Sequence, residues 1–168
     1  TQVLTLFPYT TLFRSSQLDR FLMRIDLGYP SREEEVAILS RFQEEDPLED
    51  LQAVVPPERI VELQRERGGL TVSPAVREYI ADLAAATRAH PRVRYGVSPR
   101  GALGMMRAAQ SLALIRGRDY VLPDDIKELA GPVFRHRIIL RQDERTRGAS
   151  AAVVLDEVLA KVAVPGPA

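Results

Sequence analysis

Hydrophobic residues recur every three or four positions over most of the chain, which is the spacing of one buried helix face. With the start signals, this spacing predicts six helices that begin near residues 31, 57, 73, 98, 123 and 150. Only residues 21–27 alternate like a strand, and they stop at a turn signal, Gly28-Tyr29-Pro30. One strand followed by helices does not make a self-sufficient α/β domain, so we expect the last strand of a truncated sheet and a helical domain.

The predicted helix starts rest on specific side chains. Ser73 and Ser98 each precede a proline, so the hydroxyl can cap the helix while proline at the first helical position loses no hydrogen bond. Ser31 with Glu34 forms a capping box. The helix near residue 57 stops at Gly68-Gly69, a helix-ending signal.

The same periodicity predicts which residues are buried. The expected core positions are Val36, Leu39 and Phe42; Ile60 and Leu63; Val76, Ile80, Leu83 and Ala84; Leu103, Met106, Ala109, Gln110 and Ala113 or their neighbours; Ile126, Leu129 and Val133; and Val154, Val158 and Val162.

Composition excludes several classes of protein. No apolar run approaches the roughly 20 residues of a membrane span. Equal numbers of basic and acidic residues, 23 of each, leave no global field to attract nucleic acid. There are no cysteines, and the two histidines, His90 and His136, cannot form a zinc site alone, so we expect no metal site. Without a visible secretion signal, we expect a cytoplasmic protein.

The first segment differs from the rest of the chain. Residues 5–15 hold two of the five Phe and one of the five Tyr, with no alanine, in a chain otherwise rich in arginine and alanine. The string resembles the translation of a widely used sequencing adapter. We therefore expect residues 1–16 to be an artefactual leader, the native chain to begin near Ser16 or Gln17, and residues 164–168 to be a tail. A short apolar edge strand is the alternative.

The first motif with candidate chemistry is Leu-Asp-Arg-Phe at 18–21, which leads into the predicted strand and the 28–35 turn and helix start. It resembles the end of the ATPase core in MoxR-type AAA+ proteins. That resemblance implies that Arg20 is the arginine finger, which reaches the γ-phosphate held by the neighbouring subunit. A permanently charged, planar guanidinium suits the negative charge that spreads over a transferring phosphoryl group. Alternatively, Arg20 pairs with Asp19 or with a carboxylate elsewhere in the helical domain.

The second motif is Gly-Val-Ser-Pro-Arg at 96–100, followed by a long apolar helix. It is similar to the second-sensor helix of the family, which implies that Arg100 contacts the γ-phosphate of ATP in its own subunit. An arginine in the first turn of a helix is not favoured by the helix dipole, so another interaction should hold it there. Arg107, Arg116 and Arg118 are better explained as surface or helix-end charges.

A third resemblance covers residues 120–140 and matches the penultimate lid helix, with two departures. Leu122 stands where the family usually has a capping Thr, and Pro56 where a capping Ser is common, and each lost cap costs about 1 kcal/mol. His136 is expected to satisfy helix-end carbonyls. Residues 153–157, Val-Val-Leu-Asp-Glu, imitate a magnesium-binding strand, but their apolar spacing continues as a helix.

The resemblance covers residues 17 to about 163 and implies a mainly α fold: an all-helical AAA+ lid domain at 31–163, preceded at 17–30 by the last strand of a truncated α/β ATPase core. It implies ATP and Mg²⁺, bound mainly by the missing core. It also implies a homo-oligomeric ring, a hexamer, and partners that bear von Willebrand factor A domains, with no nucleic acid and no membrane span. Since the chain has no GxxxxGK phosphate loop, we expect it to be inactive alone.

A second hypothesis is a free-standing helical adaptor that binds a partner protein and never meets ATP. A nucleic-acid-binding AAA+ relative is a weaker third, because no basic stripe or aromatic stacking pair is present. The upstream genomic sequence separates the first two. A GxxxxGK before Gln17 supports the ATPase, and a start codon there supports the adaptor.

Overall fold

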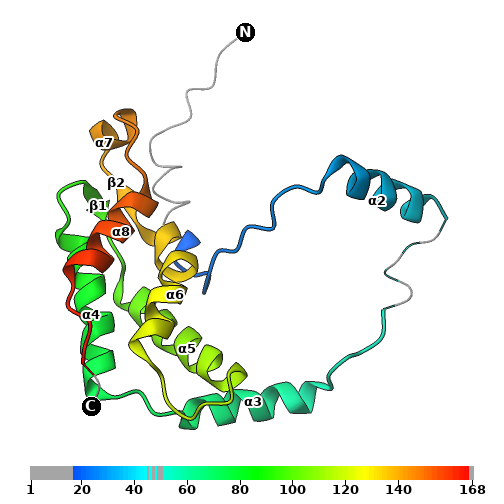
Figure 1. The fold of residues 1–168 in the computed structure, drawn as a ribbon, viewed down its shortest axis with the longest axis horizontal. Coiled ribbons are helices and arrows are strands. Elements are labelled where there is room, and N and C mark those ends of the chain that lie inside the picture. Colours follow the sequence, from blue (N-terminus) through cyan, green and yellow to red (C-terminus); the bar gives the residue numbers. More distant parts are fainter. Residues whose placement is uncertain (1–16, 45, 47, 49–50, 167–168) are drawn as a thin grey trace. The chain divides into compact units, whose positions relative to one another are not determined.

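The computed structural model describes residues 17–44, 46, 48 and 51–166 (Figure 1). The chain divides into two compact units. The first unit comprises residues 1–24 and 66–168, and the second unit comprises residues 25–65. The predicted leader, residues 1–16, lies outside the described residues.

The described chain is mainly helical, as the sequence predicts. The elements run in the order α2 (Arg32–Glu44), α3 (Pro57–Gly69), α4 (Pro74–Ala89), β1 (Val93–Tyr95), α5 (Pro99–Ile115), α6 (Pro123–Phe134), the 3₁₀ turn η1 (Arg135–Arg137), β2 (Ile139–Leu140), α7 (Gln142–Thr146) and α8 (Ala151–Lys161). None of the helices in the described part combines the length and apolar character that crossing a bilayer requires.

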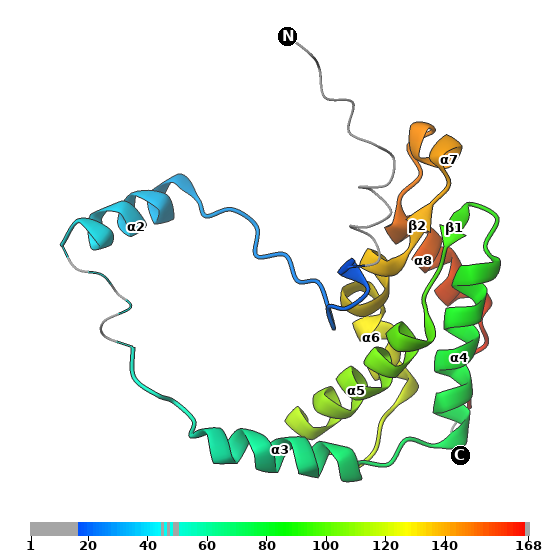
Figure 2. The ribbon, with the colours of Figure 1, turned by 180° about the vertical axis from the view of Figure 1, so that it is seen from behind.

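Four helices of the first unit surround one hydrophobic core. Helix α5 contacts α4 and α6, and α8 contacts the same two helices (Figures 1 and 2). The largest fully buried apolar side chains are Tyr79, Phe134, Leu83, Met105 and Ile126. Most of the stability of a helix comes from such packing rather than from its intrinsic propensity, so these contacts hold the helices in place.

The predicted buried face of α4 is confirmed, because Val76, Ile80, Leu83 and Ala84 are all buried. The predicted face of α5 is correct only in part. Ala109, Gln110 and Ala113 are buried, and the Gln110 amide donates to the Leu70 carbonyl at 3.1 Å.

Leu103 was expected inside α5, but it is exposed, and Met106 is only partly buried. Their neighbours Met105 and Ala108 occupy the core instead. Apart from Met105 and Gln110, the residues that α5 buries are glycines and alanines, which let the helix approach its neighbours closely, while Leu103 points outward.

A short two-stranded β-ribbon accompanies the helices, and the sequence did not predict this ribbon. Strands β1 and β2 pair in antiparallel fashion, with Val93 opposite Leu140 and Tyr95 opposite Ile139. A separate parallel bridge joins Thr71 to Tyr120. With three and two residues, the two strands are too short to show an alternating pattern in the sequence.

The strand predicted over residues 21–27 is wrong. These residues form no helix or strand in the structure. A strand exists only where a neighbouring strand supplies a ladder of hydrogen bonds, and no described segment pairs with this one. Its apolar side chains are exposed, and Leu27 is 92% accessible.

The described residues of the second unit form helices without a buried core. The predicted capping box at the start of α2 is confirmed: the Glu34 amide donates to Ser31 Oγ at 3.3 Å, and the Ser31 amide donates to Glu34 Oε2 at 2.7 Å. Hydrogen bonding of the Glu34 carboxylate by the Ser31 backbone amide, and secondly by the Ser31 side chain, holds the pKa of Glu34 below its usual value.

The buried face predicted for α2 is wrong. Val36, Leu39 and Phe42 are exposed, with accessible fractions of 49%, 67% and 60%. Helix α3 has no buried residue either. The amphipathic spacing is present, but the described residues of the second unit provide no apolar surface to cover it.

The two Ser-Pro helix starts are confirmed. Ser73 accepts from the Val76 amide and Ser98 accepts from the Gly101 amide, both at 3.2 Å. The Leu122 side chain has no hydrogen-bonding group and, as expected, does not cap α6. Instead, Asp125 accepts the Leu122 amide hydrogen at 2.9 Å, so half of a capping box survives.

Candidate functional site

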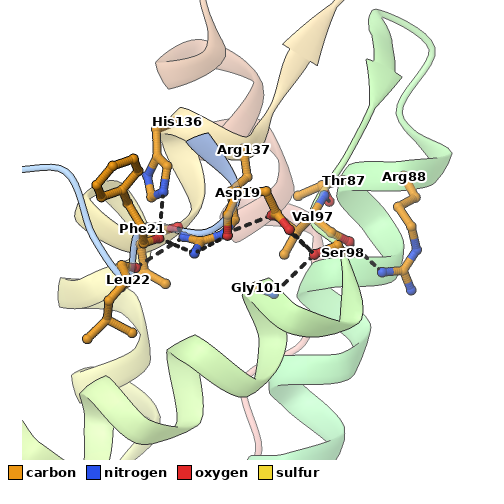
Figure 3. A network of polar contacts seen from close by, with 11 residues as sticks. Asp19, Phe21, Leu22, Thr87, Arg88, Val97, Ser98, Gly101, His136 and Arg137 are labelled. Carbon is orange, nitrogen blue, oxygen red and sulfur yellow. Dashed lines mark hydrogen bonds and ion pairs between the residues drawn. The ribbon is translucent and has the colours of Figure 1, made fainter. Parts of the chain in front are cut away.

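The Leu-Asp-Arg-Phe segment meets the start of α5, although 79 positions separate Asp19 from Ser98. The Ser98 hydroxyl donates to the Asp19 carboxylate, at 2.9 Å to Oδ2 and 3.1 Å to Oδ1 (Figure 3). The same oxygen accepts the Gly101 amide hydrogen. One hydroxyl therefore caps α5 and also holds the turn that contains Asp19.

Arg137 of η1 binds the same segment from the other side, and its side chain is almost completely buried. Its Nε donates to Asp19 Oδ1 at 3.1 Å, and its terminal nitrogens donate to the carbonyls of Asp19 and Leu22, both at 3.2 Å (Figure 3). They also donate to the carbonyls of Phe21 and Val133. We call Asp19, Ser98 and Arg137 the junction.

Charge in the junction is balanced. Burial lowers the pKa of Arg137, the Asp19 carboxylate raises it, and the nearby charge of Arg100 lowers it further. A guanidinium is not deprotonated in proteins, so Arg137 remains a cation. Because a buried cation needs a partner, the Asp19 carboxylate is the group that makes its burial tolerable.

Glycines make room for this arrangement. A Cβ on Gly101 would lie 2.8 Å from Cδ of Arg137 and 2.7 Å from a methyl group of Val97. A Cβ on Gly96 would lie 2.6 Å from the backbone nitrogen of Arg88 in α4. Both glycines of the second motif region are therefore required by close packing.

Helix α4 anchors the residue before Ser98. The Val97 amide donates to Thr87 Oγ1 at 2.9 Å, and Arg88 donates to the Val97 carbonyl at 2.6 Å (Figure 3). Val97 itself is fully buried. The start of α5 is thus fixed by α4, by its own cap and by the turn at Asp19.

The two predicted site residues, Arg20 and Arg100, are both exposed. Among the described residues, neither side chain makes a hydrogen bond or an ion pair with another group. Asp19 pairs with Arg137, so the alternative pairing of Arg20 with Asp19 is not found. Arg20 follows Asp19 directly and Arg100 lies two residues after Ser98, so the junction brings the backbones of the two segments together.

The other arginines singled out in the sequence differ among themselves. Arg107 is exposed on α5, as expected. Arg116 and Arg118 pair with Asp125, at 3.1 Å and 2.6 Å. Burial raises the pKa of Asp125, but the hydrogen bonds from Arg118 and from the Leu122 amide, with both arginine charges, lower it below its usual value overall. These two arginines therefore have a structural role between α5 and α6.

His136 lies beside the junction and contacts a carbonyl, but that carbonyl belongs to Phe21 and not, as the sequence had predicted, to a helix end. Its Nε2 is 3.3 Å from the Phe21 oxygen (Figure 3). Burial, together with the charge of Arg137, lowers the pKa of His136. The ring is therefore neutral at neutral pH, and with a carbonyl as its acceptor the proton belongs on Nε2.

The apparent magnesium motif at 153–157 is helical, as predicted, because it lies within α8. Glu157 faces His90 at 3.0 Å and Arg92 at 3.1 Å. The hydrogen bond from His90, with the charge of Arg92, holds the pKa of Glu157 below its usual value. Within the described residues, no group of three or more His, Asp or Glu side chains could hold a metal ion.

Sequence reasoning missed the role of Arg137. The residue lay inside the third motif, but nothing in the local pattern distinguishes it from Arg135, which is exposed. The one available signal was Asp19, an acid next to the candidate finger that needs a partner. A contact across 118 positions cannot be read from spacing.

Comparison with known proteins shows what the chain is similar to. The AAA lid domain family matches residues 85–158. Protein MoxR of Paracoccus denitrificans is 34% identical over 167 residues, and Chaperone MoxR1 of Mycobacterium tuberculosis is 37% identical over 159 residues. The chain carries an AAA lid domain and resembles the C-terminal portion of MoxR-type AAA+ proteins. The matches cover 88% and 89% of this chain, but 49% and 42% of those relatives.

Two further proteins are similar to this chain. YeaC of Bacillus subtilis, an uncharacterized protein, is 41% identical over 150 residues, which are 89% of this chain and 47% of YeaC. A crystal structure of a "putative ATPase" from Cytophaga hutchinsonii superposes with a TM-score of 0.80 at 32% identity and covers 90% of this chain and 49% of that one. The chain thus spans about half the length of the curated relatives it matches.

Proposed function

We propose that this chain belongs to a ring-forming, chaperone-like ATPase in which Arg20 completes the ATP site of the neighbouring subunit and Arg100 senses the nucleotide of its own subunit. The nucleotide-binding core would precede Gln17. The full-length protein means here residues 17–168 together with whatever the native reading frame encodes before them.

The observation that carries the proposal is the hydrogen bond between Asp19 and Ser98. It joins the segment of the candidate finger to the first turn of the candidate sensor helix. Two exposed guanidinium groups without described partners, Arg20 and Arg100, flank this link. Exposed guanidinium groups that make no ion pair with the described residues are available to bind an anion such as a triphosphate.

The donor set fits the phosphates of ATP but not its magnesium ion. Guanidinium groups recognise phosphate oxygens through charge and paired N–H donors. Magnesium prefers carboxylate and water oxygens, and the described residues offer no such cluster. We therefore assign the Mg²⁺ ligands and the phosphate loop to the part before Gln17, and we expect residues 17–168 alone to be inactive.

The remaining parts of the proposal follow from the family. We propose a homo-oligomeric ring, a hexamer, located in the cytoplasm, that helps to assemble proteins bearing von Willebrand factor A domains or to insert their metals. Chaperone MoxR1 is the relative whose name states a chaperone role. Titration of the full-length protein with a purified von Willebrand factor A domain protein from the same organism tests the partner. Binding that requires ATP supports it, and absence of binding in either nucleotide state contradicts it.

The substitution Arg20→Ala in the full-length protein should lower the rate of ATP hydrolysis by about 10³-fold or more, because the guanidinium stabilises charge that develops only in the transition state. Nucleotide binding, measured by titration with a fluorescent ATP analogue, should stay close to that of the parent. Arg24→Ala is the matched control, since it removes an exposed arginine from the same segment. Equal turnover in Arg20→Ala and Arg24→Ala would contradict the finger role.

The substitution Arg100→Ala should alter the response of the lid to nucleotide. Limited proteolysis with and without ATP should differ in the parent, and the difference should be lost in the variant, because the sensor no longer contacts the phosphate. Arg107→Ala on the exposed side of α5 provides the control. A nucleotide response in Arg100→Ala that matches the parent would remove the sensor role.

The native reading frame separates this proposal from the adaptor hypothesis. A GxxxxGK motif encoded before Gln17 supports the ATPase, because the phosphates need its backbone cradle. A start codon immediately before Gln17 would contradict it and leave the helical adaptor.

A further inference from the structure

Residues 17–24, which we call the Arg20 segment, have little structure of their own. Within it, the Arg20 and Phe21 amides each donate at 3.1 Å to a carbonyl three residues earlier. Its described side chains are exposed, apart from Asp19, which is partly buried. What fixes the position of this segment is therefore a set of bonds to the helices of the first unit.

Arg137 supplies most of those bonds. It donates to the carbonyls of Asp19, Phe21 and Leu22 and to the Asp19 carboxylate, so it holds the chain on both sides of Arg20 (Figure 3). The Arg24 amide adds a bond of 2.8 Å to the Pro132 carbonyl of α6. A planar guanidinium has five donors in a fixed fork, which a lysine cannot reproduce.

The site for Arg137 is built for it. The absence of a side chain at Gly101 leaves the space that its Cδ occupies. Asp19 offsets its charge, and Ser98 orients the Asp19 carboxylate while it caps α5. The same three side chains thus connect the turn before Arg20, the end of α6 and the first turn of α5.

We infer that Arg137 and Asp19 are positioning residues that hold the Arg20 segment to the start of α5, so that the finger and the Arg100 helix move as one body. This inference rests on the proposed function. If α5 shifts when Arg100 engages a phosphate, the junction carries that shift to Arg20 and thereby to the ATP of the neighbouring subunit. The junction is therefore the mechanical link between the two ATP sites.

The first test measures amide hydrogen exchange in the 168-residue chain. Arg137→Lys keeps the positive charge but loses the planar set of guanidinium donors. Asp19→Asn keeps the size of the side chain but removes its negative charge. Each substitution should raise the hydrogen-exchange rate of the Arg24 amide by about tenfold or more, because it weakens the bonds that hold the segment to α6. The exchange rates of the α4 amides should not change. Arg135→Lys and Asp26→Asn, at exposed positions, are the matched controls.

The second test measures ATP hydrolysis by the full-length protein. A finger that is present but displaced should lower kcat by about 10²-fold in Arg137→Lys, with the KM for ATP close to that of the parent. Adding Arg137→Lys to Arg20→Ala should cause no further loss, because both changes remove the same contact. A merely structural effect would add to the loss in Arg20→Ala and would also change KM.

The possible failures are distinguishable. If Arg20→Ala itself hydrolyses ATP like the parent, the proposed function is wrong. If Arg20→Ala is inactive but Arg137→Lys and Asp19→Asn have the kcat of their controls, the finger survives and the positioning role is overturned. A loss of kcat in both variants without faster exchange at Arg24 also overturns it, because the segment would then be held by something else.

Discussion

The two units of the chain form helices for different reasons. In the first unit, α4, α5, α6 and α8 share a core with fully buried side chains such as Leu83 and Phe134. In the second unit, α2 has a good capping box, but apolar residues such as Phe42 remain exposed. The comparison separates local signals, which start a helix, from packing, which stabilises it. Cooperative stability should therefore come from the first unit.

The largest difference in unfolding free energy should come from truncating a phenylalanine side chain in each unit. Phe134→Ala takes away a ring with no accessible surface and should lower the free energy of unfolding by about 3 to 5 kcal/mol. Phe42→Ala, at an exposed site, should change it by less than about 0.5 kcal/mol. Urea unfolding followed by circular dichroism measures both. A comparable loss in Phe42→Ala would show that α2 belongs to the cooperative core.

A smaller effect is expected at the ion pairs that the buried Asp125 carboxylate makes with Arg116 and Arg118. Asp125→Ala removes the acceptor of the Leu122 amide and one acceptor of each arginine, while Arg116 keeps Glu128 and Arg118 keeps the Tyr120 carbonyl. It should cost about 2 to 3 kcal/mol at pH 7, a figure reduced by the partial exposure of Arg116. Asp124→Ala is the control and should cost little, because the Asp124 carboxylate is exposed and, among the residues that the structure describes, pairs only with Lys127.

This contribution of Asp125 should depend on pH in a defined direction. Its pKa is below the usual value in the folded chain, so its stabilisation is complete above the pKa of the unfolded state, about 3.9, and is lost as pH falls through the folded pKa. The difference between the parent and Asp125→Asn should therefore shrink below about pH 4. A difference that stays constant from pH 7 to 3 would contradict the ionic account.

The smallest effect compares two helix caps. Ser98→Ala removes the cap of α5 and the bond to Asp19 and should lower the free energy of unfolding by about 1 kcal/mol. Ser31→Ala removes the cap of α2 and should fray that helix without moving the main unfolding transition. If both variants shift the transition equally, the two units unfold together.

Local signals in the sequence predicted the helix starts well. Ser73, Ser98 and Ser31 cap as expected, because a cap is decided by residues within three positions. The mainly helical fold and the buried face of α4 were equally predictable from periodicity.

Long-range pairing was not predictable in the same way. Residues 21–27 have the alternation of a strand but no partner in the described chain, and α2 has an apolar face with nothing against it. Arg137 reaches Asp19 across 118 positions. Family resemblance thus identified Arg20 and Arg100 as candidates from the sequence, while the contacts of the junction beside them are visible only in the structure.

The central claim is that Arg20 serves the ATP of a neighbouring subunit, and mixing two inactive variants of the full-length protein tests it most directly. One variant carries Arg20→Ala, and the other has an alanine in place of the phosphate-loop lysine that we assign upstream of Gln17. In a mixed ring, an intact phosphate loop can face an intact Arg20, so ATP hydrolysis should reappear on mixing. A mixture that remains as inactive as its two components would contradict a finger that acts between subunits.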